Sequence, residues 1–77
     1  MSWVFLVAGT ELKPIHIGGV NVWEHEWRAA GERADVCDPR YGQPFSFDVW
    51  TVRTDDNVIR FAAGEFSNGI WGFYVAG

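Results

Sequence analysis

Residues 45–75, FSFDVWTVRTDDNVIRFAAGEFSNGIWGFYV, carry the clearest strand pattern of the chain. Two turn sequences, at 54–57 and 67–69, divide this stretch into three short runs in which apolar residues alternate with other residues. Such alternation is typical of strands, and Ser-Asn-Gly with a left-handed glycine is typical of a three-residue hairpin loop. We therefore predict a three-stranded antiparallel meander, with strands over 45–53, 58–66 and 70–75.

The alternation of apolar residues changes phase within the first strand of this meander. Phe45, Phe47 and Val49 alternate with polar residues, and Trp50 and Val52 then follow in the opposite phase. A change of this kind indicates either a bulge where the phase changes or a strand that is buried on both faces.

The N-terminal half contains two further strand signals. The apolar run 3–7 has the length of a strand and is too short to be an independent helix. The β-branched runs 15–17 and 20–22 flank Gly18-Gly19, and both glycines can adopt the positive φ of a tight turn. We predict a hairpin here, with the pairs Ile17–Val20 and His16–Asn21.

Segment 21–31 fits two structures. As a helix it would begin with Asn21 as its N-cap and would place Trp23 and Trp27 on one face. As a strand it would place Trp23, His25 and Trp27 on one face, with the glutamates between them on the other. A helix that starts at Asn21 would be crowded against the hairpin turn. We therefore favour the strand.

Together these elements predict one small all-β domain over 1–77, an antiparallel barrel or β-roll of five to seven short strands that ends in the meander. A short strand at 33–38 and the loop after it connect the two halves. Gly64 and Gly72 lie inside predicted strands, where glycine often marks a bend of a twisted sheet. The alternative is an α+β domain with one short helix at 21–31.

Composition argues against several classes of partner. Ten acidic and six basic side chains give a net charge of −4, so polyanions such as nucleic acids and anionic membranes are repelled. The sequence has no apolar run long enough to span a membrane, and its N-terminal apolar run lacks the basic lead-in expected of a signal peptide. Cys37, the only cysteine, cannot form an internal disulfide, and we expect it to be buried. We expect a cytoplasmic protein without a cofactor, whose partner is another protein or a second copy.

Few residues offer metal or acid–base chemistry. His16 and His25 lie on either side of the predicted hairpin turn, but His25 lies beyond the matched length of the hairpin. A metal bound by both would need a bend or a second chain. Nothing in the spacing places either histidine beside Cys37, as a cysteine nucleophile and its base require. Metal binding through the histidines is therefore the weakest of the hypotheses.

Glu65 is the acidic residue whose position depends most on the fold. If the alternation of Phe61 and Ala63 continues, its carboxylate points inward and is a candidate general acid or ligand anchor. If a bulge at Gly64 reverses the phase, Glu65 points outward and Phe66 points inward. Glycine at this position favours the bulge.

Aromatic residues are the strongest functional signal, with five Trp, six Phe and two Tyr. Tryptophan and tyrosine dominate binding hot spots because they bring a large contact area. We therefore predict a non-catalytic β module with an aromatic, acidic interface, either a homo-oligomer or a subunit docked on another protein, for example as an inhibitor or immunity protein. The alternative is a small-ligand binder or enzyme that uses a β-roll interior, with Glu65 and His25 as polar anchors. The predicted binding residues are Trp23, His25, Trp27, Tyr41, Trp50, Glu65 and Trp71.

Overall fold

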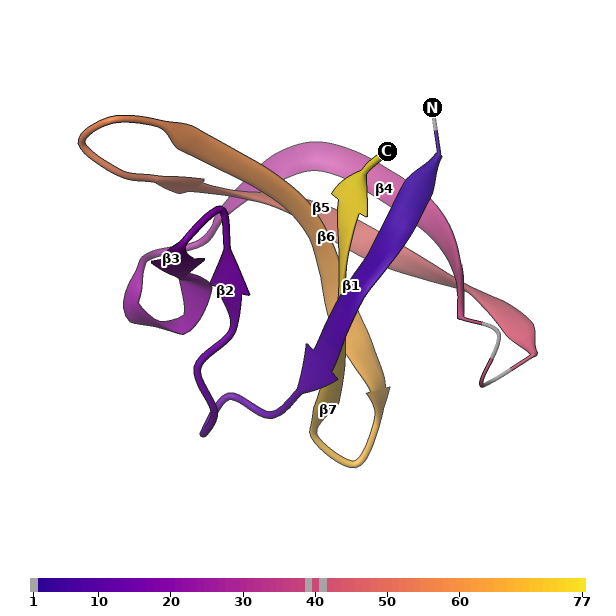
Figure 1. Ribbon diagram of the computed structural model, residues 1–77. Helices are drawn as coiled ribbons and strands as arrows, with labels where there is room; N and C mark the ends of the chain where they lie inside the picture. The colour runs from indigo at the N-terminus through magenta and orange to yellow at the C-terminus, as the bar shows by residue number, and fades with distance from the viewer. Residues whose placement is uncertain (1, 39, 41) are drawn as a thin grey trace.

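The computed structural model describes residues 2–38, 40 and 42–77, and the regular structure in this part of the chain is almost entirely β. Five strands form an antiparallel sheet in the order β1-β7-β6-β5-β4, and two short strands form a separate hairpin (Figure 1). The all-β prediction is therefore confirmed. The strands of the sheet are β1 (Trp3–Gly9), β4 (Arg28–Asp38), β5 (Gln43–Arg53), β6 (Val58–Ser67) and β7 (Ile70–Ala76), and those of the hairpin are β2 (His16–Ile17) and β3 (Val20–Asn21).

The predicted C-terminal meander is confirmed as β5, β6 and β7. The pairing of β5 with β6 runs without a shift from Asp48–Ala63 to Arg53–Val58, so the change of phase in β5 is not a bulge. The Gly18-Gly19 turn also joins β2 and β3 in the predicted register. The loop between β6 and β7 is one residue shorter than predicted, because Ser67 still pairs with Ile70 across it.

Segment 21–31 is neither the favoured continuous strand nor the alternative helix. A single 3-10 turn, η1 (Val22–Glu24), follows β3, and β4 begins before the segment ends. The Oδ1 atom of Asn21 accepts hydrogen bonds from the backbone N–H groups of Trp23 and Ile15, both at 3.2 Å. An asparagine that bonds neighbouring backbone groups in this way competes with regular pairing, and here it produces a capped turn.

The predicted strand 33–38 is the second part of the longer strand β4. The register of β4 shifts around Gly31, whose φ is +76°, and the strand continues through this irregularity. β5 begins two residues before the predicted strand 45–53, and its Pro44 pairs with Cys37 of β4. The prediction that Cys37 is buried is wrong, because it lies on the outward side of β4 and is exposed.

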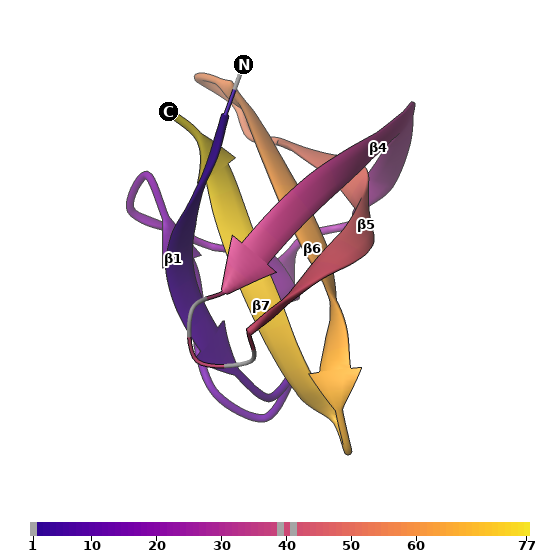
Figure 2. The same ribbon diagram turned by 90° about the vertical axis from the view of Figure 1, so that its right-hand side faces the viewer.

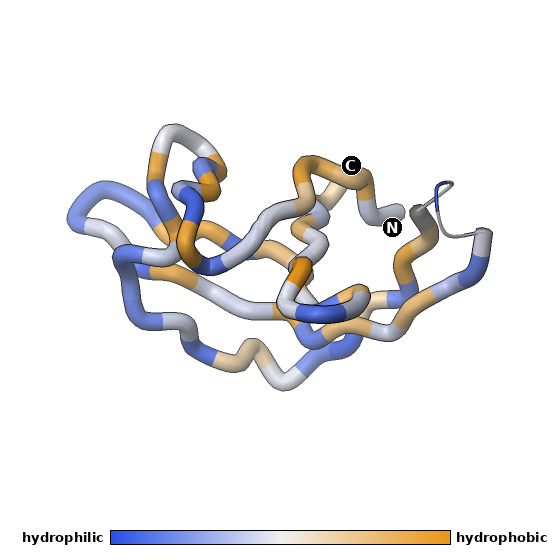
Figure 3. The backbone as a smooth tube through the Cα atoms, turned by 90° about the horizontal axis from the view of Figure 1, so that it is seen from below, coloured by the Kyte–Doolittle hydropathy of each residue, from blue (hydrophilic) through white to orange (hydrophobic). Residues whose placement is uncertain are grey.

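Side chains on the two faces of the sheet form two separate cores, the hairpin-side cluster and the roll-side cluster. Successive strand residues point to opposite faces, and β5, β6 and β7 contribute buried residues to both cores. Figure 3 accordingly shows apolar residues along the hairpin and along the sheet. The buried members of the hairpin-side cluster are Ile15, Ile17, Val22, Val52, Ile59, Phe61, Ala63 and Phe73; those of the roll-side cluster are Ala34, Val36, Phe47, Val49, Ala62 and Tyr74.

The roll-side cluster is covered by the sheet itself, because β4 crosses over the sheet at a steep angle and approaches β1 (Figure 2). Among the described residues no backbone pairing joins β1 to β4, so the sheet is not the closed barrel that was one of the predicted forms. Cationic side chains instead bridge the seam, the line along which β1 and β4 approach each other. Arg60 pairs with Glu32 of β4 and lies over the ring of Trp3 in β1. Arg40 lies 4.5 Å from the ring centroid of Phe5.

Gly64 and Gly72 lie opposite each other on β6 and β7, and each is covered by a phenylalanine ring. A Cβ atom at Gly64 would lie 2.3 Å from Cδ1 of Phe47, and one at Gly72 would lie 2.2 Å from Cζ of Phe66. The two rings can pack directly on the backbone only because both positions lack a side chain.

Candidate functional site

Four of the predicted site residues meet in one group of rings on the hairpin side of the sheet. Trp23 and Trp27 are stacked, with 4.7 Å between ring centroids and 19° between ring planes. Trp71 lies edge-on to both of them, and Trp50 lies 5.8 Å from Trp27. All four rings are half-buried, so they belong to the edge of the core and also reach the surface.

The other three predicted residues do not join this group. His25 is exposed at the end of η1 and does not line any of the clefts described below. Tyr41 lies outside the described residues. Glu65 is exposed, so its carboxylate does not point into the interior of the roll.

Glu65 is exposed for a reason that differs from the predicted bulge at Gly64. Phe66 packs against the roll-side cluster, as Ala62 does, so the alternation continues through Gly64 without a change of phase. The pairing of β6 with β7 becomes irregular only after Glu65, before Ser67. Glu65 therefore lies on the same face as the hairpin-side cluster, at a position where that face is no longer covered.

The cleft beside Glu65 is a fork between β5 and β6. β5 pairs with β6 only as far as the Asp48–Ala63 pair, whereas it continues to pair with β4 as far as Gln43. Among the described residues, no backbone pairing joins segment 43–47 to segment 64–67. The opening has a volume of about 370 Å³, and we call it the fork cleft. It is lined by Arg33, Phe45, Ser46, Phe47, Asp48, Trp50, Ala63, Gly64, Glu65 and Trp71.

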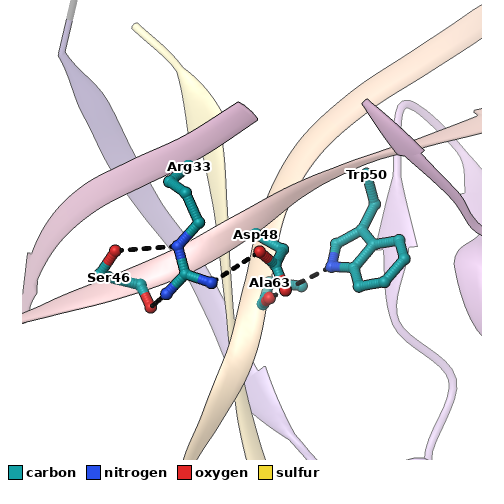
Figure 4. A network of polar contacts seen from close by, with 5 residues as sticks. All are labelled: Arg33, Ser46, Asp48, Trp50 and Ala63. Atoms are coloured by element: carbon teal, nitrogen blue, oxygen red, sulfur yellow. Dashed lines mark hydrogen bonds and ion pairs between the residues drawn. The ribbon is translucent and has the colours of Figure 1, made fainter. Parts of the chain in front are cut away.

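Aromatic side chains form the closed end and the floor of the fork cleft. The Nε1 atom of Trp50 donates a hydrogen bond of 3.4 Å to the carbonyl of Ala63, which is the last residue of β6 to pair with β5 (Figure 4). Beyond this point Phe47 lies against Gly64, and Phe45 packs beside it from the roll side. The cleft therefore has an apolar base and opens on the hairpin side of the sheet.

The two walls of the fork cleft differ in net charge. On one wall Arg33 donates to Oδ1 of Asp48 and to the carbonyl of Ser46, both at 2.8 Å, and to Oγ of Ser46 at 3.2 Å (Figure 4). On the other wall Oε2 of Glu65 accepts a hydrogen bond of 3.2 Å from the backbone N–H of Gly69. Arg33 and Asp48 neutralise each other, so Glu65 supplies the uncompensated charge of the cleft.

The other clefts and titratable residues of the described chain are weaker candidates for a functional site. A cleft of about 330 Å³ near the turn between β5 and β6 has acidic and basic residues but no aromatic ring. A third cleft, of about 260 Å³, adjoins the other side of Trp50. His16 is exposed and lies opposite Asn21. Among the described residues no group of three or more His, Cys, Asp and Glu side chains is arranged to hold a metal ion.

Comparison with known proteins gives no relative to which this chain can be assigned. No protein-family model matches the sequence, and no curated protein or solved structure matches it significantly. The part of the chain that the structure describes contains no helix with the length and apolar character needed to cross a membrane.

The sequence prediction included Trp50, Trp71 and Glu65 but missed the opposite wall of the fork cleft. Alternation along β5 does place Ser46 and Asp48 on the same face as Trp50, so their direction could be predicted. The signal for the fork itself is Pro44, because proline in a strand is tolerated best where the strand lacks a second neighbour.

Proposed function

We propose that this chain is a non-catalytic interaction module that binds an extended segment of a partner protein in the fork cleft. The observation that carries the proposal is the parting of β5 and β6 beyond the Asp48–Ala63 pair, where a cleft opens between the two strands beside Trp50 and Trp71. An extended segment can pair its main chain with a free strand edge while pockets beside that edge accept alternate side chains.

The aromatic walls support binding because they are already held in place. Trp71 packs edge-on against Trp23 and Trp27, and Trp50 bonds to the backbone of Ala63. Rings that are fixed before a partner arrives lose little conformational freedom on binding. The volume of the cleft, about 370 Å³, lies in the range of ligand sites, roughly 300–1,000 Å³.

The polar groups of the cleft favour binding over catalysis. The hydroxyl of Ser46 already accepts a hydrogen bond from Arg33, and neither His16 nor His25 lines the cleft. A serine nucleophile needs a base within hydrogen-bonding distance. The exposed position of Glu65 also weakens the case for the alternative function, a small-molecule site in the interior of the roll.

Selection of a random dodecapeptide display library on the protein, followed by amide NMR with a selected peptide, tests the proposal. We expect the peptide to shift the amide signals of 43–47 and 64–67 and to slow their hydrogen exchange, because main-chain pairing protects amides. The matched control is the same peptide with alternate backbone nitrogens methylated, which keeps the side chains and removes the donors. This control should lose binding.

Three results would overturn the proposal. One is a library from which no binding peptide is enriched. Another is a set of signal changes centred on the outer edges β1 or β4 instead of on the fork. The third is a homodimer, detected by sedimentation of the protein alone, in which a second copy occupies the fork.

A further inference from the structure

We infer that the segment bound in the fork cleft presents an arginine or lysine side chain, which is held between the carboxylate of Glu65 and the ring of Trp71. This inference rests on the proposed function. Glu65 and Trp71 are directly opposite each other in the β6–β7 pair, and both line the cleft. Opposite residues on one face of a sheet have Cβ atoms about 4.5–5.5 Å apart, so one cation can contact both side chains.

The carboxylate of Glu65 is positioned and still has hydrogen-bonding capacity. Its Oε2 atom accepts from the backbone N–H of Gly69, in the turn that follows β6. No side-chain cation among the described residues pairs with this carboxylate. The Oε1 atom is therefore available to a donor from a bound segment, and a charged donor gives the stronger hydrogen bond.

The opposite wall of the cleft does not cancel this preference. Arg33 is its only cation among the lining residues, and its three hydrogen bonds go to Asp48 and Ser46. One basic and two acidic lining residues leave a net charge of −1 in the cleft, within a chain whose net charge is −4. This charge favours a basic segment and disfavours an acidic one.

Trp71 supplies the second contact for the cation. Its half-buried ring is held edge-on by Trp23 and Trp27, and the face of an indole attracts cations. Arginine should bind more tightly than lysine, because a planar guanidinium stacks on the ring while it donates to the carboxylate.

Titration with four capped pentapeptides, Ac-Val-Xaa-Val-Xaa-Val-NH2 with Xaa as Arg, Lys, Gln or Glu, tests the inference. We expect affinity to decrease in that order. Glu65→Gln should weaken binding of the Arg peptide about tenfold and reduce the preference for the Arg peptide over the Gln peptide, since a charged acceptor is lost. The amide oxygen of the new side chain can still accept from Gly69, so the turn is preserved. Glu11→Gln removes the same charge from an exposed residue outside the cleft and should change nothing.

The possible outcomes separate the inference from the function on which it rests. If the Arg and Gln peptides bind the fork equally and Glu65→Gln has no effect, the inference is wrong and the proposed function stands. If none of the four peptides shifts the amide signals of 43–47 and 64–67, both are wrong. If the Arg peptide binds preferentially but loses no affinity in Glu65→Gln, another residue recognises the cation and the inference is again overturned.

Discussion

The hairpin-side and roll-side clusters share the strands β5, β6 and β7, yet the two faces of these strands are covered in different ways. On the hairpin side a separate segment, the β2–β3 hairpin with η1, lies on the sheet. Val22 of this segment is fully buried, and its carbonyl accepts a 2.7 Å hydrogen bond from Trp27. On the roll side the sheet bends over itself, and the rings of Phe47 and Phe66 pack on its glycines.

The different ways in which the two faces of the sheet are covered explain how the fork cleft arises. A separate hairpin can cover a face and leave the sheet continuous. On the opposite face β4 crosses over the sheet together with its partner β5, and β5 leaves β6 beyond the Asp48–Ala63 pair (Figure 2). The candidate binding site is therefore a structural consequence of the way the roll-side cluster is enclosed.

The largest effect is expected from Phe61→Ala, which breaks the hairpin-side cluster. Phe61 has no exposed surface and contacts the ring of Trp27 at 5.0 Å between centroids. Truncation of a buried phenylalanine costs about 3–5 kcal/mol, which is close to the whole stability of a small domain. Urea unfolding followed by tryptophan fluorescence measures this loss. Phe61→Leu, with an expected cost of about 1–2 kcal/mol, provides a variant that still folds. A cost below 1 kcal/mol for the alanine variant would contradict the central position of this cluster.

An intermediate effect is expected from Gly64→Ala, which disturbs the packing of the roll-side cluster alone. The added methyl group would overlap the ring of Phe47, and overpacking of this kind costs about 1–3 kcal/mol. The same unfolding experiment measures the loss. The NMR signals of the stacked pair Trp23 and Trp27 should stay unchanged, because they belong to the other face.

A double substitution distinguishes the clash from a general effect of alanine in β6. Phe47→Leu leaves room for the new methyl group, so the costs of Gly64→Ala and Phe47→Leu should not add. If the double variant loses the full sum of the two single costs, the contact between Phe47 and Gly64 does not determine the packing on this face.

The smallest effect is expected from Asn21→Ala, which removes hydrogen bonds of the hairpin segment but leaves the buried residues of the hairpin-side cluster in place. The backbone N–H groups of Ile15 and Trp23 would both lose their acceptor. Loss of a cap of this kind costs about 0.5–2 kcal/mol. Thermal unfolding measures the change, and Asn21→Asp, which retains an acceptor oxygen, should keep most of the stability. Equal losses in the two variants would show that the hydrogen bonds to Asn21 do not hold the hairpin.

The elements that could be predicted from the sequence are those with local signals. Alternation and turn residues identified the strands of the meander, and Gly18-Gly19 identified the hairpin and its register. These features depend on φ preferences and on the direction of successive side chains, which act over a few residues. The grouping of Trp23 with Trp27 was predicted for the same reason, although the segment that carries them is a capped turn followed by a short loop.

The closure of the roll, the fork and the position of Glu65 depend on tertiary contacts and could not be predicted from the sequence. The strands β5, β6 and β7 carry apolar residues on both faces, so alternation cannot tell which face remains covered at a given position. The fork depends on Phe47 meeting Gly64, and the seam depends on Arg60 meeting Glu32 and Trp3. These residues are far apart in the chain, and no local preference determines whether their side chains meet.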